Sequence, residues 1–234
     1  MKKRLLAFFL CLLVLLSAPG CAAERYSLLY RLTVGPITYC VRGNGTRPRQ
    51  IVLKADDEVI WTTSVKVSSK VGAGDGTYGF EVLDLNFDGY QDFMIPNNVS
   101  GECTFYLCWL WDPESGDYRQ SKELSGLANI RVNNDMKALF TFAHSYEEEK
   151  AYPDAPAATI STDSTTKFIW KDGKPIPEIR ASITYYSEFE RYCYAVAYYD
   201  EDLEKFGDSD DRWLTPAEYA ERDMSFLYYF RNDS

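Results

Sequence analysis

The chain of 234 residues carries 35 acidic and 25 basic residues, which gives a formal net charge of −10 at pH 7. This length suffices for one sizeable domain or two small ones. An acidic surface disfavours nucleic acid and anionic lipid headgroups as partners, whereas it suits a basic protein or divalent cations. The single histidine makes a multi-histidine zinc site or a histidine-dependent catalytic triad hard to build.

Residues 1–20 have the three-part layout of a secretory signal peptide: basic "MKKR", apolar "LLAFFLCLLVLL" and a small-residue exit. The apolar run is too short to span a bilayer comfortably. The exit "SAPGC" is similar to a bacterial lipobox, although Ala18 stands where that motif usually has Leu, and it predicts lipidation of Cys21. The protein would then be held at the membrane or envelope by the lipid anchor alone. Cleavage after Ala23 would instead give a soluble secreted or periplasmic protein, so both readings predict an extracytoplasmic location.

Four cysteines remain beyond the signal segment and its exit: Cys40, Cys103, Cys108 and Cys193. An even number in an oxidising compartment predicts two disulfides. Residues 103–111 have the composition of a strand, in which five residues separate two Cα atoms by about 16 Å. A disulfide requires roughly 4.4–6.8 Å. Cys103 and Cys108 are therefore expected in separate bridges, and their order of pairing with the other two cysteines stays open.

Most of the remaining chain predicts β-strands, because Val, Ile, Thr and aromatic residues dominate runs that turn signals separate. The predicted strands are 26–34, 50–55, 58–67, 78–85, 92–96, 104–111, 138–144, 166–171, 179–187 and 191–199. Residues 147–164 are expected to form an exposed loop. With no repeat period and no clear linker, residues 21–234 predict a single all-β domain. Its sheets should be mainly antiparallel, in a sandwich or a curled arrangement.

One short helix is predicted near the C-terminus, at about residues 215–223. Thr215 suits the N-cap, Pro216 the first helical position, and Glu218 completes a capping box.

The segment "DLNFDGYQD" at residues 84–92 places an oxygen-bearing group at every second position. Such spacing surrounds one point with the oxygen ligands that Ca²⁺ prefers, and Gly89 permits the sharp turn. The predicted ligands of a structural Ca²⁺ are Asp84, Asn86, Asp88, the carbonyl of Tyr90, and Asp92. The intervening Leu85 and Phe87 should dock into the core. Ile95 stands where an EF-hand needs Glu, and both flanks read as strands, so a calcium β-loop is predicted. The alternative is a metal-free turn in which the same side chains accept backbone N–H groups.

This loop resembles the calcium β-loops of integrin-type FG-GAP repeats. Residues 78–180, roughly, resemble a family of secreted bacterial β-proteins through three stretches: "LDLNFDGYQDFMI", "FYLCWLWDPESGDYRQSKELSGLANIRVN" and "TKFIWKDGKPI". The family's motifs are a D-x-N-x-D-G-x-x-D loop, an aromatic strand ending in a D-P-x-x-G turn, and an E-L-S-x-L segment. Some members are lipoproteins that look like lysozyme inhibitors. The resemblance implies a non-enzymatic inhibitor or immunity protein against a peptidoglycan-cleaving enzyme.

No catalytic residue is predicted. A carboxylate pair for glycoside hydrolysis could be drawn, by abundance alone, from Glu188, Glu190, Asp200, Glu201 and Asp202. His144 is expected to lie at a strand end with a local hydrogen bond. The 18 tyrosines either form a partner-binding surface or alternate between the two faces of strands. We therefore expect a binding protein for a protein or cell-wall ligand; the alternatives are a cell-envelope hydrolase and a carbohydrate-binding surface protein.

Overall fold

A computed structural model describes residues 26–67, 76–149 and 158–221 of the chain. The signal segment 1–20 and Cys21 lie outside these residues. The described fold is built from antiparallel sheets with little helix, which confirms the all-β prediction. None of the described helices has the length and apolar character needed to cross a membrane.

The described residues divide into two compact units, with the boundary between Lys66 and Val67. The division falls just before the glycine-rich sequence "VGAGDGTYG", which offers few side chains that could be buried in a shared core.

The first unit is a meander of four antiparallel strands in chain order. They are β1 (Ser27–Val34), β2 (Ile37–Asn44), β3 (Arg47–Ala55) and β4 (Glu58–Ser64). Strand β2 was not predicted, although Ile37, Tyr39 and Val41 alternate along it. Tyr39 and Val41 are buried, as a strand in the middle of a sheet requires.

The second unit begins with a four-stranded antiparallel sheet in the order β5-β6-β7-β8. Its strands are β5 (Glu81–Leu83), β6 (Asp92–Ser100), β7 (Cys103–Asp112) and β8 (Asp117–Ser121). Helix α2 (Lys122–Ser125) follows β8 directly; the hydroxyl of Ser121 caps it by accepting the N–H of Leu124 at 3.2 Å. Leu124 is fully buried and fixes this turn of helix against the sheet.

A seven-stranded antiparallel sheet completes the second unit, in the order β14-β13-β12-β11-β10-β9 with β15 also paired to β13. Its strands are β9 (Arg131–Asn133), β10 (Ala138–Glu149), β11 (Ala158–Lys171), β12 (Lys174–Tyr186), β13 (Arg191–Asp200), β14 (Lys205–Phe206) and β15 (Asp210–Leu214). The loop predicted at 147–164 is wrong for its described part, because β10 and β11 extend to Glu149 and from Ala158 as one long ladder. Residues 150–157 lie outside the described chain.

Helix α3 (Pro216–Glu221) follows β15 and has the predicted capping box. The backbone N–H of Thr215 donates to the carboxylate of Glu218 at 2.7 Å, and the N–H of Glu218 donates to the Thr215 hydroxyl at 3.3 Å. Residues 222–223 of the predicted helix lie beyond the described chain.

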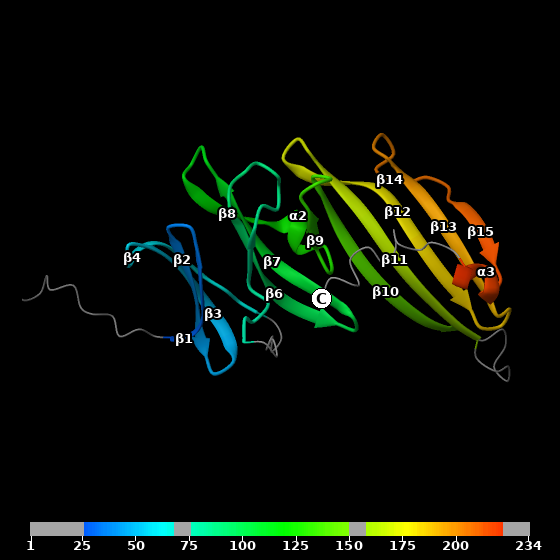
Figure 1. The fold of residues 1–234 in the computed structure, drawn as a ribbon, viewed down its shortest axis with the longest axis horizontal. Helices are drawn as coiled ribbons and strands as arrows, with labels where there is room; N and C mark the ends of the chain where they lie inside the picture. Colours follow the sequence, from blue (N-terminus) through cyan, green and yellow to red (C-terminus); the bar gives the residue numbers. More distant parts are fainter. Residues whose placement is uncertain (1–25, 68–75, 150–157, 222–234) are drawn as a thin grey trace, which may run out of the picture. The chain divides into compact units, whose positions relative to one another are not determined.

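One hydrophobic cluster joins the β5–β8 sheet to strands β9–β11 of the seven-stranded sheet. These strands lie beside the β5–β8 sheet in Figure 1. Its buried members include Leu85, Met94, Cys108, Leu124 and Leu139. Phe87 packs against this cluster, so both apolar positions of the predicted calcium loop dock into the core as expected. The cluster therefore anchors the loop to the core through Leu85 and Phe87.

The four described cysteines are free thiols, so the predicted disulfides are not formed. Cys103 and Cys108 do lie on one strand, as predicted. Cys108 is buried in the cluster just described, which contains no second cysteine. Burial raises the pKa of its thiol to about 12. Cys108 therefore acts as an apolar residue of the core.

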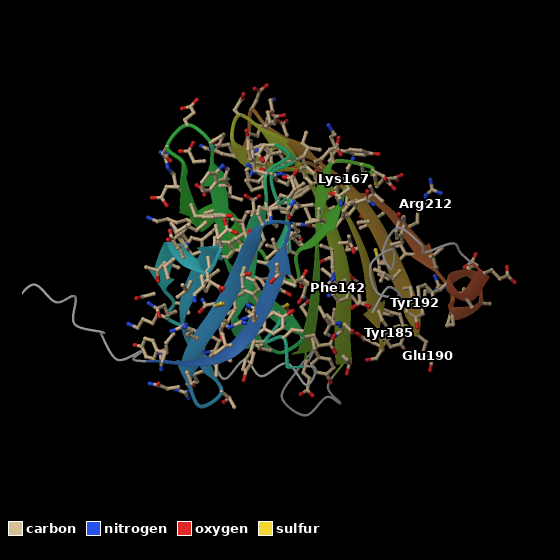
Figure 2. The ribbon with its side chains drawn as sticks, turned by 60° about the vertical axis from the view of Figure 1, so that its left-hand side comes forward. Phe142, Lys167, Tyr185, Glu190, Tyr192 and Arg212 are labelled. Carbon is tan, nitrogen blue, oxygen red and sulfur yellow. The ribbon has the colours of Figure 1, made fainter. Side chains whose placement is uncertain are left out.

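The tyrosines of β12 and β13 alternate between the two faces of the sheet. Tyr185 and Tyr192 are cross-strand neighbours with ring centroids 4.9 Å apart, at the same end of the sheet in Figure 2. The ring of Tyr219 from α3 stacks on Tyr192 at 4.1 Å. The next residue, Tyr186, contacts Trp213 instead, at 5.2 Å. This is the period-two pattern of a strand.

Candidate calcium loop and adjacent pocket

The loop at residues 84–92 connects β5 to β6, so the predicted strand–loop–strand placement holds and an EF-hand is excluded. Two residues turn the chain with positive φ: Phe87 at 62° and Gly89 at 88°. Only glycine adopts this conformation without a steric penalty. Phe87 offsets its penalty by packing its ring on the core cluster.

The loop side chains converge on backbone N–H groups within the loop. The N–H of Asp88 donates to Oδ1 of Asp84 at 3.2 Å and to Oδ1 of Asn86 at 3.3 Å. The N–H of Gly89 donates to Oδ2 of Asp84 at 2.9 Å, and that of Tyr90 to Oδ1 of Asp88 at 2.9 Å. The oxygens of Asp84 and Asn86 therefore lie close together, because both reach one N–H group.

Asp92 ties the loop to strand β7. Its side chain is fully buried; Oδ2 accepts the N–H of Leu85 and Oδ1 accepts the N–H of Trp111, both at 2.8 Å. Burial raises the pKa of Asp92 to about 7, against the lowering effect of these two bonds, and the charges of Asp88 and Asp84 add to the rise. The three loop carboxylates thus repel one another.

The residues of the loop fit a hard cation in ligand type and spacing. Each carboxylate oxygen that accepts one N–H retains a second lone pair, so the bonds described do not use up its capacity. Burial raises the pKa of Asp92 most and repulsion by Asp88 and Asp84 adds to it; a cation would offset both effects. Among the described residues, no three or more His, Cys, Asp or Glu side chains form a ready-made metal-binding group. The same contacts are those of the metal-free alternative, and calcium stays a prediction.

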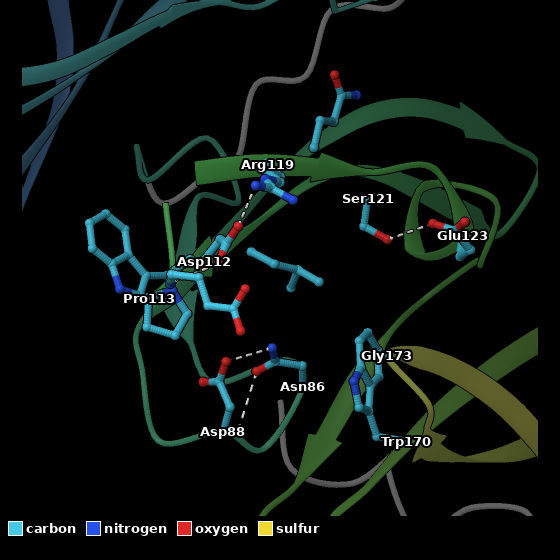
Figure 3. Close-up of a pocket in the computed structure, with 13 residues that line it drawn as sticks. Asn86, Asp88, Asp112, Pro113, Arg119, Ser121, Glu123, Trp170 and Gly173 are labelled. Atoms are coloured by element: carbon cyan, nitrogen blue, oxygen red, sulfur yellow. Dashed lines mark hydrogen bonds and ion pairs between the residues drawn. The ribbon is translucent and has the colours of Figure 1, made fainter. Parts of the chain in front are cut away.

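A pocket of about 430 Å³ lies next to the loop. Four segments line it: the loop with Asn86 and Asp88, the β7–β8 hairpin with residues 110–114 and 119–121, the start of α2, and the end of β11 with the turn that follows (Figure 3). These segments contain the sequence motifs on which the family resemblance rests. Motifs far apart in the chain are therefore neighbours around one pocket.

Two acidic side chains of the pocket are held in the ionised state. The pKa of Asp112 is lowered, first by the Ser115 hydroxyl, which donates at 2.9 Å, and then by backbone N–H groups and Arg119. Arg119 Nη2 lies 2.6 Å from Oδ2 of Asp112. The pKa of Glu123 is lowered, first by its own backbone N–H and then by the Ser121 hydroxyl at 3.2 Å.

Two half-buried tryptophans, Trp111 and Trp170, also line the pocket. Trp170 packs against the core cluster. Trp111 meets Tyr118 edge-on at 5.0 Å, and the Tyr118 hydroxyl donates to the carbonyl of Gln91 at 3.1 Å. Because Asp92 also holds the N–H of Trp111, one wall of the pocket is bonded to the loop.

The five carboxylates named for glycoside hydrolysis fall into two groups at opposite ends of β13. Glu188 and Glu190 precede the strand, whereas Asp200 ends it and Glu201 and Asp202 follow, so about 30 Å separates the groups. A catalytic pair requires about 5–9.5 Å, so no pair can be formed across the two groups. Glu201 instead pairs with Lys171 at 2.6 Å on the surface.

His144 forms a local contact, as predicted, but in the middle of β10 rather than at a strand end. Its Nδ1 lies 2.7 Å from Oδ1 of Asp163, its cross-strand neighbour.

The sequence did not predict a role for the pocket residues Trp111, Asp112, Glu114, Glu123 and Trp170. The D-P-x-x-G motif predicted only a turn. The three motifs of the family resemblance could have indicated these residues, because each motif carries polar or aromatic side chains that its own turn does not need.

No protein-family model and no curated protein matches the chain. Among solved structures, the chain is similar to one described as the structure of a Xanthomonas type IV secretion system related protein. The likeness has a TM-score of 0.41 at 11% identity and covers 80% of this chain and 87% of the other. A likeness at this level carries no statement about function.

Proposed function

We propose that this protein is an extracytoplasmic, calcium-stabilised binding protein that inhibits a peptidoglycan-cleaving enzyme. Lipidated Cys21 would tether it to the cell membrane or envelope. Ca²⁺ would be held by Asp84, Asn86, Asp88, the Tyr90 carbonyl and Asp92. When bound, the ion would supply no chemistry beyond charge neutralisation and rigidity of the loop.

The observation that carries this proposal is the pocket beside the loop. Asn86 and Asp88 belong to the loop and also line the pocket. Ion binding would therefore fix part of the pocket wall and its charge. An acidic recess on an acidic protein suits a cationic partner, and electrostatic attraction speeds such an encounter.

The ionisation of the pocket acids supports binding rather than hydrolysis. A glycosidase needs one carboxyl whose pKa is raised, so that it can donate a proton to the leaving group. The pKa values of Asp112 and Glu123 are lowered instead. Asp92 has a raised pKa, but it is fully buried and both its oxygens accept backbone N–H groups.

The proposal is tested by mixing the protein with a panel of cationic lysozymes and following the clearing of a peptidoglycan suspension. We expect wild-type protein in Ca²⁺ to block clearing by at least one enzyme of the panel, and chelator to weaken this block. Absence of any block and of any complex across the panel would contradict the proposal. Clearing by the protein alone would show the hydrolase instead.

A cell-wall glycan is the second candidate ligand, and the indole of Trp170 in the pocket favours it. Indole rings offer apolar faces on which sugar rings can pack while acids and amides accept hydroxyl groups. Titration with a soluble oligosaccharide of the cell wall distinguishes this candidate, because it would bind without any lysozyme present.

A further inference from the structure

The seven-stranded sheet has one face whose centre is buried. Thr165, Ala181 and Ile183 lie on this face, because Thr165 pairs with Ala181 and alternate residues of a strand share a face. Their side chains are 2%, 0% and 4% exposed, whereas Tyr146 and Tyr198 at the margins of the same face are 58% and 67% exposed. We name this surface of strands β10–β13 the Ile183 face.

The sheet alone does not explain this burial. Side chains stand roughly perpendicular to a sheet, so neighbours in the sheet flank a side chain and leave its outer end open. The hydrophobic cluster on this face contains Ala181 and Ile183, and its one described member from outside the sheet is Tyr219 of α3. Tyr219 stacks on Tyr192 of β13, two strands away from Thr165. A further segment of chain is needed to cover Thr165 and Ala181.

The segment that follows α3 has the composition of such a cover. Residues 222–234 read "RDMSFLYYFRNDS", and six of the seven residues at 224–230 are apolar or aromatic. Exposure of a run of this kind to water is unfavourable. We propose that residues 224–230 pack across the Ile183 face as its ligand from within the same chain. This inference does not depend on the proposed function.

The segment starts at this face and is long enough to cross it. Helix α3 ends at Glu221 and is held to the face by Tyr219, which stacks on Tyr192 (Figure 2). Neighbouring strands lie about 4.8 Å apart, so β13 and β10 are separated by about 14 Å across the face. Seven extended residues span about 23 Å. The run at 224–230 can therefore reach all four strands.

The other segment outside the described chain that is attached to this sheet fits the face less well. Residues 150–157 read "KAYPDAPA" and contain one aromatic residue. They connect β10 to β11 beyond the pair of Glu149 with Ala158, which lies seven residues along the ladder from the pair of Phe142 with Thr165. Seven residues of strand are about 23 Å long. Composition and distance both favour residues 224–230.

The direct test is photo-crosslinking in the full chain. Tyr228→p-benzoylphenylalanine places a photoreactive group in the middle of the run. The matched control is Phe189→p-benzoylphenylalanine in the turn between β12 and β13, where the side chain is 58% exposed. After irradiation, cross-linked peptides from the monomer are identified by mass spectrometry. We expect the Tyr228 variant to link to peptides that contain Thr165, Ala181 or Ile183, and the control to link only near its own turn.

A second test removes the segment. The chain that ends at Glu221 should bind a hydrophobic fluorescent dye that the full chain does not bind, and its Tm should fall by about 5 °C or more as buried apolar area is lost. A capped peptide of residues 222–234 should displace the dye. The same peptide with Phe226→Ser, Leu227→Ser and Phe230→Ser should not.

Three results would overturn the inference. The first is a Tyr228 variant that forms no links to the Ile183 face within the monomer. The second is links found only in dimers, which would assign the face to a second copy of the chain. The third is a shortened chain that binds no more dye and melts at the same temperature as the full chain. Should the shortened chain fail to fold, photo-crosslinking of the full chain decides alone.

Discussion

Two acidic segments of this protein have similar compositions and different structures. In the loop at 84–92, the acids point inward and share backbone N–H groups. In the acidic segment at 200–211, they lie on the surface: Asp200 accepts the N–H of Leu203, and Glu201 pairs with exposed Lys171. The difference lies in the backbone, because Phe87 and Gly89 curl the loop around a point. Acid content alone therefore does not predict a cation site.

The largest contrast between the segments should come from Asp92→Ala. The change leaves the N–H groups of Leu85 and Trp111 without an acceptor, at about 1–3 kcal/mol for each buried group, although release of a buried charge offsets part of this. Loss of bound Ca²⁺ would add to the deficit. We expect the free energy of unfolding in Ca²⁺ to fall by about 4–5 kcal/mol, measured by urea denaturation.

The matched control for Asp92→Ala is Asp211→Ala in the acidic segment, whose exposed carboxylate accepts only the nearby Ser209 hydroxyl. Its stability should stay within about 0.5 kcal/mol of wild type. Equal losses for the two variants would contradict the distinction between the segments.

The second contrast is the response to metal. At a hundredfold excess over its dissociation constant, Ca²⁺ should stabilise the protein by about 2.7 kcal/mol, which raises Tm by about 5–10 °C for a domain of this size. Mg²⁺ should substitute poorly because it gives up its waters reluctantly. Asp88→Ala should remove most of the response, whereas Asp202→Ala should keep it. Calorimetric melts with and without chelator measure the shift; equal responses of the two variants would refute the loop as the site.

The third contrast is the pH dependence of the metal-free protein. The pKa of Asp92 is raised from 3.8 to about 7 on folding, so between these values the folded state binds more protons than the unfolded state. Stability should therefore increase as pH falls from 7 towards 5, by at most about 1.4 kcal/mol per unit. Asp92→Asn should lose this slope. A slope shared by wild type and Asp92→Asn would assign it to other groups.

The smallest effect should come from the surface ion pair of Glu201 with Lys171. Both side chains are about half exposed, so solvent screens the pair, and Glu201→Gln should lower Tm less than Asp92→Ala does. Its calcium response in the melting experiment should equal that of wild type. A larger loss would mean that the acidic segment contributes more to the fold than its exposure indicates.

Apart from β2, whose buried Tyr39 and Val41 were overlooked, sequence patterns predicted the strands whose side chains pack the core and missed those that depend on a neighbouring strand. Strands β7 and β13 were found from their apolar and aromatic residues. Strands β8 and β15, "DYRQS" and "DDRWL", carry little such signal and form because β7 and β13 offer free edges. The ends of β10 and β11 can be polar because the backbone pairing between the two strands stabilises them.

The loop could be located from sequence because all its candidate ligands lie within residues 84–92. The pocket could not, because its four segments are separated by other strands and meet only through sheet pairing and the core cluster. The predicted disulfides are not formed between the four described cysteines. The number of cysteines cannot distinguish a cysteine that forms a disulfide from one, such as Cys108, that packs in the core.

Titration of Ca²⁺ into chelator-treated protein by isothermal calorimetry tests the central claim most directly. The account predicts one binding event per chain, abolished in Asp88→Ala and unchanged in Asp202→Ala, with protons released near pH 7 as Asp92 ionises. Absence of any heat at millimolar Ca²⁺, together with a melting curve that chelator does not move, would contradict it. "DLNFDGYQD" would then be a hydrogen-bonded turn without metal.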